Sequence, residues 1–418
     1  MQVQVQVQKQ MQTQEEFPRV LAAESVSNFG SMLSRLAIPW LAALVLDASA
    51  WQMAGLLVAD VVAAALGSLL LASWVDRHGK RAVMLLADGA RAALLAALAL
   101  AAWQGWVGFA LLLVAAAASG LLTVAFELAR SAWTAQRVPV ADLPRRNAQL
   151  AVAGSLSETL AFALGGWLYQ GLGAAWALAV DAASYAVSAC FLRGVHELPA
   201  APAAAPEQAR PSLWRDAADG LRAVAQRPAL RALAGIQTLQ AFAIALTGTS
   251  YTIYVSRDLA ISTGPLGMIA AVGGLGAVLG ASLAPRLGRR WGPGRTMTLG
   301  LALLALGAAC IPAASGAGWL AIGWLLLHQL IGDAGFTVHD VHDRSLRQTA
   351  VPHALLARAD AGIRSAGHLA LLAGAMAGGA LGTVFNARFV LWLAAAVAAA
   401  AALLAAWLLA ERGPGKPQ

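Results

Sequence analysis

The chain has 418 residues, of which 59% are apolar and 12% charged, and its mean hydropathy is +0.65. Soluble globular proteins carry about 25% charged residues, so this composition excludes a soluble globule and predicts a protein embedded in lipid. The net charge of +8 is spread over short segments instead of one surface with stacking aromatic residues, so we exclude nucleic acid as a partner.

The N-terminal segment, residues 1–16, alternates glutamine and valine before two glutamates. One short strand has nothing to pair with, so we expect a disordered tail. The segment also lacks the basic, apolar and cleavage regions of a signal peptide.

Twelve apolar runs follow, each near the roughly 20 residues that a membrane-spanning helix needs. They cover residues 19–46, 51–74, 82–102, 105–128, 148–171, 174–195, 229–256, 263–285, 296–315, 318–340, 359–385 and 388–410. The one long connection, residues 196–228, contains a stretch at 214–224 with apolar groups on one face and charges opposite. This stretch predicts a helix that lies along the membrane interface.

Three short patterns occur twice, which indicates an internal duplication. The repeated pairs are Arg77-His78-Gly79-Lys80-Arg81 with Arg286-Leu287-Gly288-Arg289-Arg290, Val138-Pro139 with Val351-Pro352, and Gly165-Gly166 with Gly378-Gly379. Because the copies keep their order and nearly one spacing, we predict an all-α membrane protein with twelve transmembrane helices in two pseudo-symmetric six-helix bundles, residues 17–195 and 229–410. Such repeats are typical of transporters, whose substrate path runs between the halves.

The positions of the cations predict the orientation. Of the 29 lysines and arginines, Arg257 and Arg388 lie between runs on one side, Arg35 and Arg91 lie inside runs, and the others lie on the opposite side. This bias places the tail 1–16, the linker 196–228 and the tail 411–418 in the cytoplasm. The two cysteines, at positions 190 and 310, lie inside apolar runs, so no disulfide framework is expected.

The segment from Gly67 through Asp76-Arg77-His78-Gly79-Lys80-Arg81 resembles the loop signature of the major facilitator superfamily. Asp88-Gly89-Ala90-Arg91 and Asp181-Ala182-Ala183-Ser184 resemble its bacterial exporter branch, which includes macrolide-efflux and enterobactin-export proteins. The resemblance covers nearly the whole chain and implies a secondary transporter of the bacterial inner membrane that works by rocking of its halves.

In that family the charged loop latches the two halves together. The resemblance therefore implies a gating role for Asp76, Arg77, Gly79, Lys80, Arg81, Gly288, Arg289 and Arg290. The alternative is that these cations only anchor the topology.

Ionisable residues inside spans are expensive and usually functional. Glu158 lies near the middle of the fifth run with no cation within a turn of its own helix. We favour a role in loading and releasing a proton over that of a permanently neutral, hydrogen-bonded acid. The full set of proton-coupling candidates is Glu158, Asp333, Glu24, Asp60 and Asp181.

The first run carries Glu24, Asn28, Ser31 and Arg35 on one continuous helical face. Arg35 and Asp60 lie at matching depths, which predicts an ion pair of either structural or functional kind. Asp88 and Arg91 stand one turn apart and are expected to support the structure. Asp181 fits the family pattern, which implies a place in the outer cavity.

In the second half, Asp333 on the tenth run and Arg364 on the eleventh are expected to pair. The candidate cavity residues of both halves are Asn28, Arg35, Gln237, Gln240, Tyr251, His328, Arg364 and His368. His339, His342 and Asp343 share a helical face beside two arginines, and we expect a charged helix end there instead of a metal site.

These features predict a secondary active transporter that acts as a monomer, without a cofactor, on a small amphipathic compound such as a drug or siderophore. The preferred mode is proton-coupled efflux, and the alternatives are import or lipid flipping by the same fold. A non-transporting sensor or a membrane-embedded enzyme is the alternative of another class. The chain lacks a phosphate-binding loop and the zinc-protease and hydrolase motifs, which disfavours ATP-driven transport and enzymatic activity.

Overall fold

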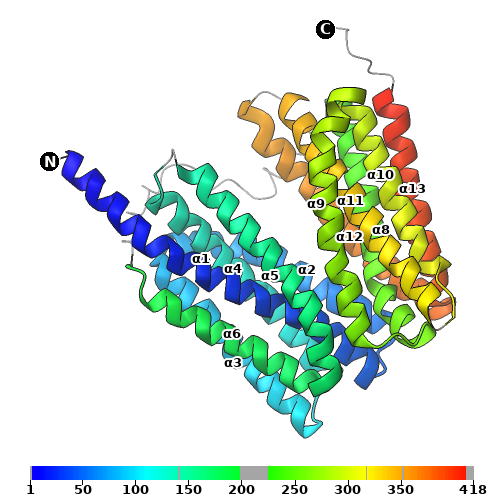
Figure 1. The fold of residues 1–418 in the computed structure, drawn as a ribbon, viewed down its shortest axis with the longest axis horizontal. Coiled ribbons are helices and arrows are strands. Elements are labelled where there is room, and N and C mark those ends of the chain that lie inside the picture. Colours follow the sequence, from blue (N-terminus) through cyan, green and yellow to red (C-terminus); the bar gives the residue numbers. More distant parts are fainter. Residues whose placement is uncertain (1, 140–141, 198–224, 317, 351–352, 411–418) are drawn as a thin grey trace. The chain divides into compact units, whose positions relative to one another are not determined.

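The computed structural model describes residues 2–139, 142–197, 225–316, 318–350 and 353–410. Within these ranges every regular element is helical and no strand occurs (Figure 1), so the all-α prediction is confirmed. Lipid offers no hydrogen-bond partners, and a helix satisfies its backbone groups internally. The predicted interfacial helix at 214–224 and the tail 411–418 lie outside the described residues.

Twelve long α-helices lie in the described part of the chain. They are α1 (Gln2–Trp40), α2 (Ala50–Arg77), α3 (Lys80–Gln104), α4 (Phe109–Arg137), α5 (Leu143–Leu172), α6 (Ala174–Arg193), α8 (Pro228–Ile253), α9 (Thr263–Trp291), α10 (Pro293–Ala313), α11 (Trp319–Ala350), α12 (His353–Val384) and α13 (Ala387–Ala410). Several extend past the apolar runs into polar sequence, and α1 begins at Gln2 where we expected a disordered tail.

Among the described residues, ten helices are long and apolar enough to cross a membrane, which supports a multi-pass membrane protein. Helices α1 and α5 are not among these ten. The same polar side chains that mark candidate sites, Glu24 and Asn28 on α1 and Glu158 on α5, lower the hydropathy of these two helices.

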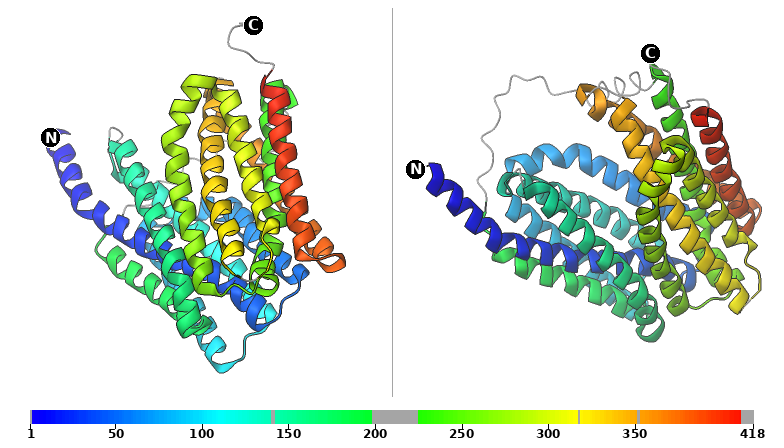
Figure 2. Two further views of the ribbon diagram at one scale, coloured as in Figure 1. Left: turned by 45° about the vertical axis from the view of Figure 1, so that its right-hand side comes forward. Right: turned by 45° about the horizontal axis from the view of Figure 1, so that its top comes forward.

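The chain divides into two compact units. Unit 1 comprises Met1–Leu46 and Ala59–Ala209, and unit 2 comprises Asp47–Val58 and Arg210–Gln418. In unit 1, α1 packs against α5 and α6, and α3 packs against α4 and α6. Figures 1 and 2 both show α1 alongside α6.

Unit 2 repeats this pattern of packing. Helix α8 packs against α12 and α13, and α10 packs against α11 and α13. Helices α1 and α8 also end alike, in the π-helices η1 (Leu41–Val45) and η3 (Tyr254–Asp258). The duplication seen in the sequence therefore extends to helix pairing and helix ends.

Glycines set the close helix contacts of unit 2. A Cβ on Gly276 of α9 would lie 2.5 Å from the carbonyl oxygen of Leu330 on α11, and one on Gly300 of α10 would lie 2.7 Å from that of Gly335. Gly374 of α12 approaches Phe242 of α8 in the same way. These helices approach to backbone contact because no side chain separates them.

Candidate functional site

The turn between α2 and α3 is shorter than the connection predicted between the apolar runs 51–74 and 82–102. Residues 73–77 form the end of α2 and α3 begins at Lys80, so only His78 and Gly79 form the turn. Arg77 is exposed, and the side chain of Asp76 lies outside the described residues.

The two cations after the turn find partners inside unit 1. Lys80 is 1% exposed and its Nζ donates to the carbonyl of Val75 at 2.6 Å. Arg81 donates from Nε to the carbonyl of Leu192 at 3.1 Å and from Nη2 to that of Arg193 at 2.9 Å. Because the last carbonyls of a helix lack intrahelical partners, these cations stabilise the ends of α2 and α6.

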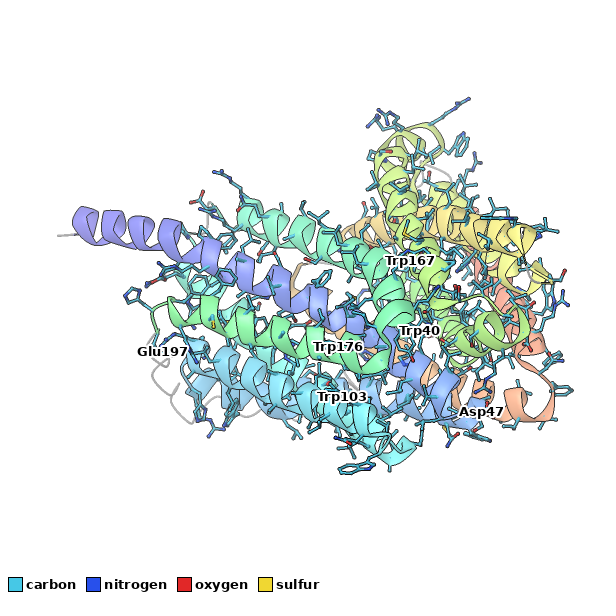
Figure 3. The ribbon with its side chains drawn as sticks, turned by 60° about the horizontal axis from the view of Figure 1, so that its bottom comes forward. Trp40, Asp47, Trp103, Trp167, Trp176 and Glu197 are labelled. Atoms are coloured by element: carbon cyan, nitrogen blue, oxygen red, sulfur yellow. The ribbon has the colours of Figure 1, made fainter. Side chains whose placement is uncertain are left out.

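Glu197, which the sequence did not single out, completes this turn. Its carboxylate accepts hydrogen bonds from the backbone N–H groups of Arg81 at 3.1 Å and Ala82 at 2.9 Å. A Cβ on Gly79 would lie 2.5 Å from the Glu197 Cδ, so glycine leaves room for the carboxylate. Glu197 follows α6 (Figure 3) and caps the positive end of α3.

A second carboxylate, that of Glu16, accepts several hydrogen bonds near the same end of unit 1. Glu16 is 2% exposed and accepts from Arg137 Nε at 2.9 Å and Nη2 at 3.0 Å, and from His196 Nδ1 at 2.5 Å. Burial raises the pKa of Glu16, but the hydrogen bonds from Arg137 and His196 outweigh it and hold that pKa below its ordinary value. Glu16 thereby joins α1, the end of α4 and the residues after α6.

The second copy of the charged pattern lies within α9, which continues to Trp291, and not in a loop. A Cβ on Gly288 would lie 2.5 Å from His342 Nε2 of α11. His342 is buried, and its Nδ1 donates to the carbonyl of Val338 at 2.8 Å. Arg289 and Arg290 are exposed.

Asp88 and Arg91 form the centre of a buried polar network in unit 1. Arg91 Nη2 lies 2.5 Å from Asp88 Oδ1, with side chains 2% and 0% exposed. Ser188 of α6 donates to Asp88 Oδ2 at 2.6 Å. The Arg91 guanidinium lies over the rings of Tyr185 at 4.2 Å and Phe126 at 4.9 Å. The pair therefore links α3, α4 and α6, in the structural role that we predicted.

Asp181, which the resemblance places in the outer cavity, is 0% exposed in the described structure. Its carboxylate accepts hydrogen bonds from Ser34 of α1 and from Ser184, the latter at 3.3 Å. A Cβ on Gly30 would overlap Asp181 and Ser184. Glycine at position 30 thus lets α1 and α6 approach around the buried acid.

Glu24 pairs with Arg130, a residue of α4 that lies just beyond the predicted fourth run. Arg130 Nε is 2.6 Å from Glu24 Oε2, and the side chains are 21% and 20% exposed. Glu127, one turn before Arg130, also interacts electrostatically with Glu24. Asn28, one turn along α1, donates to the carbonyl of Gly154 at 3.1 Å. The polar face of α1 therefore meets α4 and α5.

Arg35 and Asp60 are not joined by a contact ion pair in the described structure. They interact electrostatically at longer range, and both side chains are exposed. A Cβ on Gly120 of α4 would lie 2.9 Å from Asp60 Oδ1. Glu158, the carboxylate that the sequence favoured for proton coupling, is exposed on α5.

In unit 2, polar residues of α8 and α11 lie together. His328 Nδ1 donates to the carbonyl of Gly307 at 2.9 Å, which leaves Nε2 as an acceptor in the neutral ring. The ring of Tyr251 lies 6.4 Å from that of His328. Asp333 interacts electrostatically with Tyr251 and contacts Gly273 of α9.

Other predicted residues of unit 2 lie elsewhere. Arg364 and His368 are exposed on α12, and no ion pair joins Arg364 to Asp333 among the described residues. Gln237 lies against Gly367 of α12. Gln240 is 4% exposed, and it shares a helical face of α8 with the core residues Ile236 and Ala243. Gln240 is thus buried among the core residues of α8.

The histidine and aspartate group at the end of α11 is capped by arginines. Asp340 pairs with Arg344 at 2.8 Å, and Asp343 pairs with Arg347. No group of three metal-binding side chains occurs in the ranges that the structure describes.

Residues 20–342 match the Major Facilitator Superfamily. A curated relative, the uncharacterized MFS-type transporter y4rN of Sinorhizobium fredii, is 29% identical over 251 residues, which cover 58% of this chain and 59% of the relative.

Solved transporters share the fold. The nucleoside transporter NupG has a TM-score of 0.71 at 15% identity, over 93% of this chain and 97% of its own. A bacterial homologue of the iron transporter ferroportin, in an inward-facing state, has a TM-score of 0.71 at 16% identity, over 94% and 98%.

The chain belongs to the major facilitator superfamily. It is therefore a secondary transporter of the membrane, and the family resemblance read from its charged loop is confirmed.

Proposed function

We propose that this transporter exports a small amphipathic compound in exchange for protons, by alternating access in the bacterial inner membrane. The observation that carries the proposal is the Glu24–Arg130 pair, a carboxylate and a guanidinium 2.6 Å apart on α1 and α4, each about one-fifth exposed. A charged pair that is neither fully buried nor fully solvated keeps access to protons and substrate.

Protonation of Glu24 removes the negative charge that holds Arg130. An arginine without a counter-ion within a membrane span costs free energy, so Arg130 then pairs with another anion. Glu127 stands one helical turn away on α4, and its side chain is exposed. A switch of Arg130 from Glu24 to Glu127 couples proton uptake to a movement of α4 against α1.

Glu158 is the second coupling position. It lies on α5, one helical turn past Gly154, whose carbonyl accepts from Asn28 of the polar α1 face. In unit 2, Tyr251, His328 and Asp333 supply an aromatic ring, a neutral acceptor and a carboxylate, a mixture that suits an amphipathic ligand with a hydrogen-bond donor.

The test is transport of candidate compounds in inside-out vesicles under an imposed pH gradient. We expect Glu24→Gln or Glu158→Gln to abolish accumulation driven by the gradient while leaving exchange of substrate for substrate. Asp258→Asn, at an exposed carboxylate after α8, is the control and retains full activity. Gradient-driven accumulation by both glutamine variants would remove proton coupling from these residues, and accumulation only in right-side-out vesicles would establish import.

The α2–α3 turn is proposed to gate this cycle together with its second copy in α9. Asp76→Asn is expected to reduce transport without reducing membrane insertion, and wild-type transport by this variant would leave the turn with a topological role alone.

A further inference from the structure

The cations in the two copies of the repeated charged pattern differ in burial and in hydrogen-bond partners. In the first copy, Lys80 is buried on the carbonyl of Val75, and Arg81 donates to two carbonyls at the end of α6. In the second copy, Arg289 and Arg290 are exposed and make no side-chain hydrogen bond or ion pair within the described structure. Their charges are therefore available to a partner.

Arg286 of the same copy and Arg295 of α10 complete a patch with these two residues, here called the α9–α10 arginine patch: Arg286, Arg289, Arg290 and Arg295. All four are exposed. Arg286 donates only to the carbonyl of Ser282 on its own helix, at 3.0 Å. The turn at Gly292, with φ 79°, holds the ends of α9 and α10 together.

The helices around this patch offer no described acid to neutralise it. Helices α9 and α10 contain no aspartate or glutamate. On α11, which packs against both, the two acids nearest its end are Asp340 and Asp343, and these are paired with Arg344 and Arg347. Within the described part of these three helices, the patch thus keeps its four positive charges.

The patch also lies where two candidate membrane spans meet, so we expect it at the level of the lipid headgroups. Arg286, Arg289 and Arg290 belong to the last turns of the span Thr263–Trp291, and Arg295 lies near the start of the span Pro293–Ala313. Trp291 is 43% exposed, and the Arg290 guanidinium lies 5.9 Å from the centre of its ring. Arginine and tryptophan together are typical of the membrane interface.

We infer that the α9–α10 arginine patch binds the headgroups of anionic phospholipids. A guanidinium binds phosphate oxygens through two parallel hydrogen bonds, which an exposed fork of donors permits. Each arginine near an anionic surface adds about fivefold to binding, so loss of three weakens it roughly a hundredfold. This inference does not depend on the transported substrate or on proton coupling.

The experiment is native mass spectrometry of the full chain in detergent with added phosphatidylglycerol or phosphatidylcholine. We expect the wild type to prefer phosphatidylglycerol. The variant Arg289→Gln/Arg290→Gln/Arg295→Gln is expected to lose that preference by roughly a hundredfold. Asp340→Asn/Arg344→Gln, which removes an acid and its paired exposed arginine of the same unit together, is the control and retains it.

Added glycerol phosphate competes weakly if the lipid is the ligand, and displacement at equal concentration would assign the patch to a soluble phosphate compound instead. If the triple variant fails to insert, the salt dependence of the wild type's lipid preference is measured instead. An electrostatic preference for phosphatidylglycerol falls as the salt concentration rises. A salt-independent preference, or an undiminished one in the variant, overturns the inference.

Discussion

Asp47 and Ala260 have the same left-handed backbone conformation, with φ of 49° and 50°, and lie 213 residues apart, the difference between 260 and 47. Each follows a π-helix, and the residue after each π-helix donates its N–H to the first carbonyl of that π-helix: Leu46 to Leu41 and Leu259 to Tyr254. L-residues rarely adopt this conformation, so its recurrence at equivalent positions is a signature of duplication.

The side chain of Ala260 has no polar atom to offset this conformation, whereas Asp47 pairs with Arg257 at 2.9 Å. We expect Ala260→Gly to stabilise the protein by roughly 0.5–1 kcal/mol, since glycine adopts positive φ without a steric penalty. Thermal unfolding in detergent measures the change. Ala183→Gly, on the exposed side of α6, is the control and destabilises by about as much. Equal losses at both positions would show that residue 260 is not strained.

Gly288 is in contact with His342, so Gly288→Ala is expected to cost about 1–3 kcal/mol by overpacking. Adding His342→Ala removes the obstacle, and the double variant is expected to be more stable than the sum of the two single changes. Gly89→Ala is the matched control, because nothing lies within 4 Å of its added Cβ, and the helix gains about 1 kcal/mol. Strictly additive effects at 288 and 342 would contradict the close contact.

In unit 1, Glu24 and Arg130 are in direct contact, whereas Arg35 and Asp60 are not, so the energetic coupling within the two pairs is expected to differ. A double-mutant cycle on Glu24→Gln and Arg130→Gln is expected to give an interaction of about 1–3 kcal/mol, measured by thermal stability. The cycle on Asp60→Asn and Arg35→Gln is expected to give about 0.5 kcal/mol or less, because these residues interact only at longer range. The reverse ranking would indicate that Arg35 and Asp60 form the tighter pair.

Arg91→Met is expected to destabilise unit 1 by about 3–5 kcal/mol, because it leaves the Asp88 carboxylate buried beside Ser188 without a counter-ion. Asp88→Asn/Arg91→Met removes both charges and is expected to recover most of that loss. Yield of folded protein and melting temperature are the measurements. No recovery in the double variant would mean that Arg91 acts mainly through the rings of Tyr185 and Phe126.

The pKa of Glu16 is lowered in the folded state, so its contribution to stability is present above its unfolded pKa, near 4.5, and is lost as the pH falls through the lower folded value. We expect Glu16→Gln to reduce the melting temperature at neutral pH and to match the wild type in strong acid. Asp142→Asn is the control for general effects of acid. A difference that grows on acidification would show the opposite sign of linkage.

The overall architecture followed from apolar run length and from the repeated Arg-x-Gly-basic-basic pattern. Run length finds helices because lipid requires internally satisfied backbones. Run length places the ends of helices poorly. Helix α4 continues past the apolar run to Arg137, so Arg130 lies just outside the predicted span. A search for charges on the same helical face as Glu127 finds Arg130.

Contacts between distant segments were harder to predict. Glu197 caps α3 across 116 residues of sequence, and no periodic signal connects the two. Matching depth suggested that Arg35 pairs with Asp60, but depth along a helix leaves the facing direction open. The expected pair of Asp333 and Arg364 on neighbouring runs lacked the same information. Gln240 has a polar side chain, yet it is buried because it shares a helical face with the core residues Ile236 and Ala243.

Helices α1 and α5, which are not among the ten apolar spans, have a consequence for biogenesis. A segment that carries Glu24 and Asn28 is poorly retained by hydrocarbon on its own and is held by its protein neighbours, chiefly α5 and α6. Those neighbours are synthesised last in unit 1. We expect stable integration of α1 to wait until residue 193 has left the ribosome, so that α1 settles only after the helices that hold it.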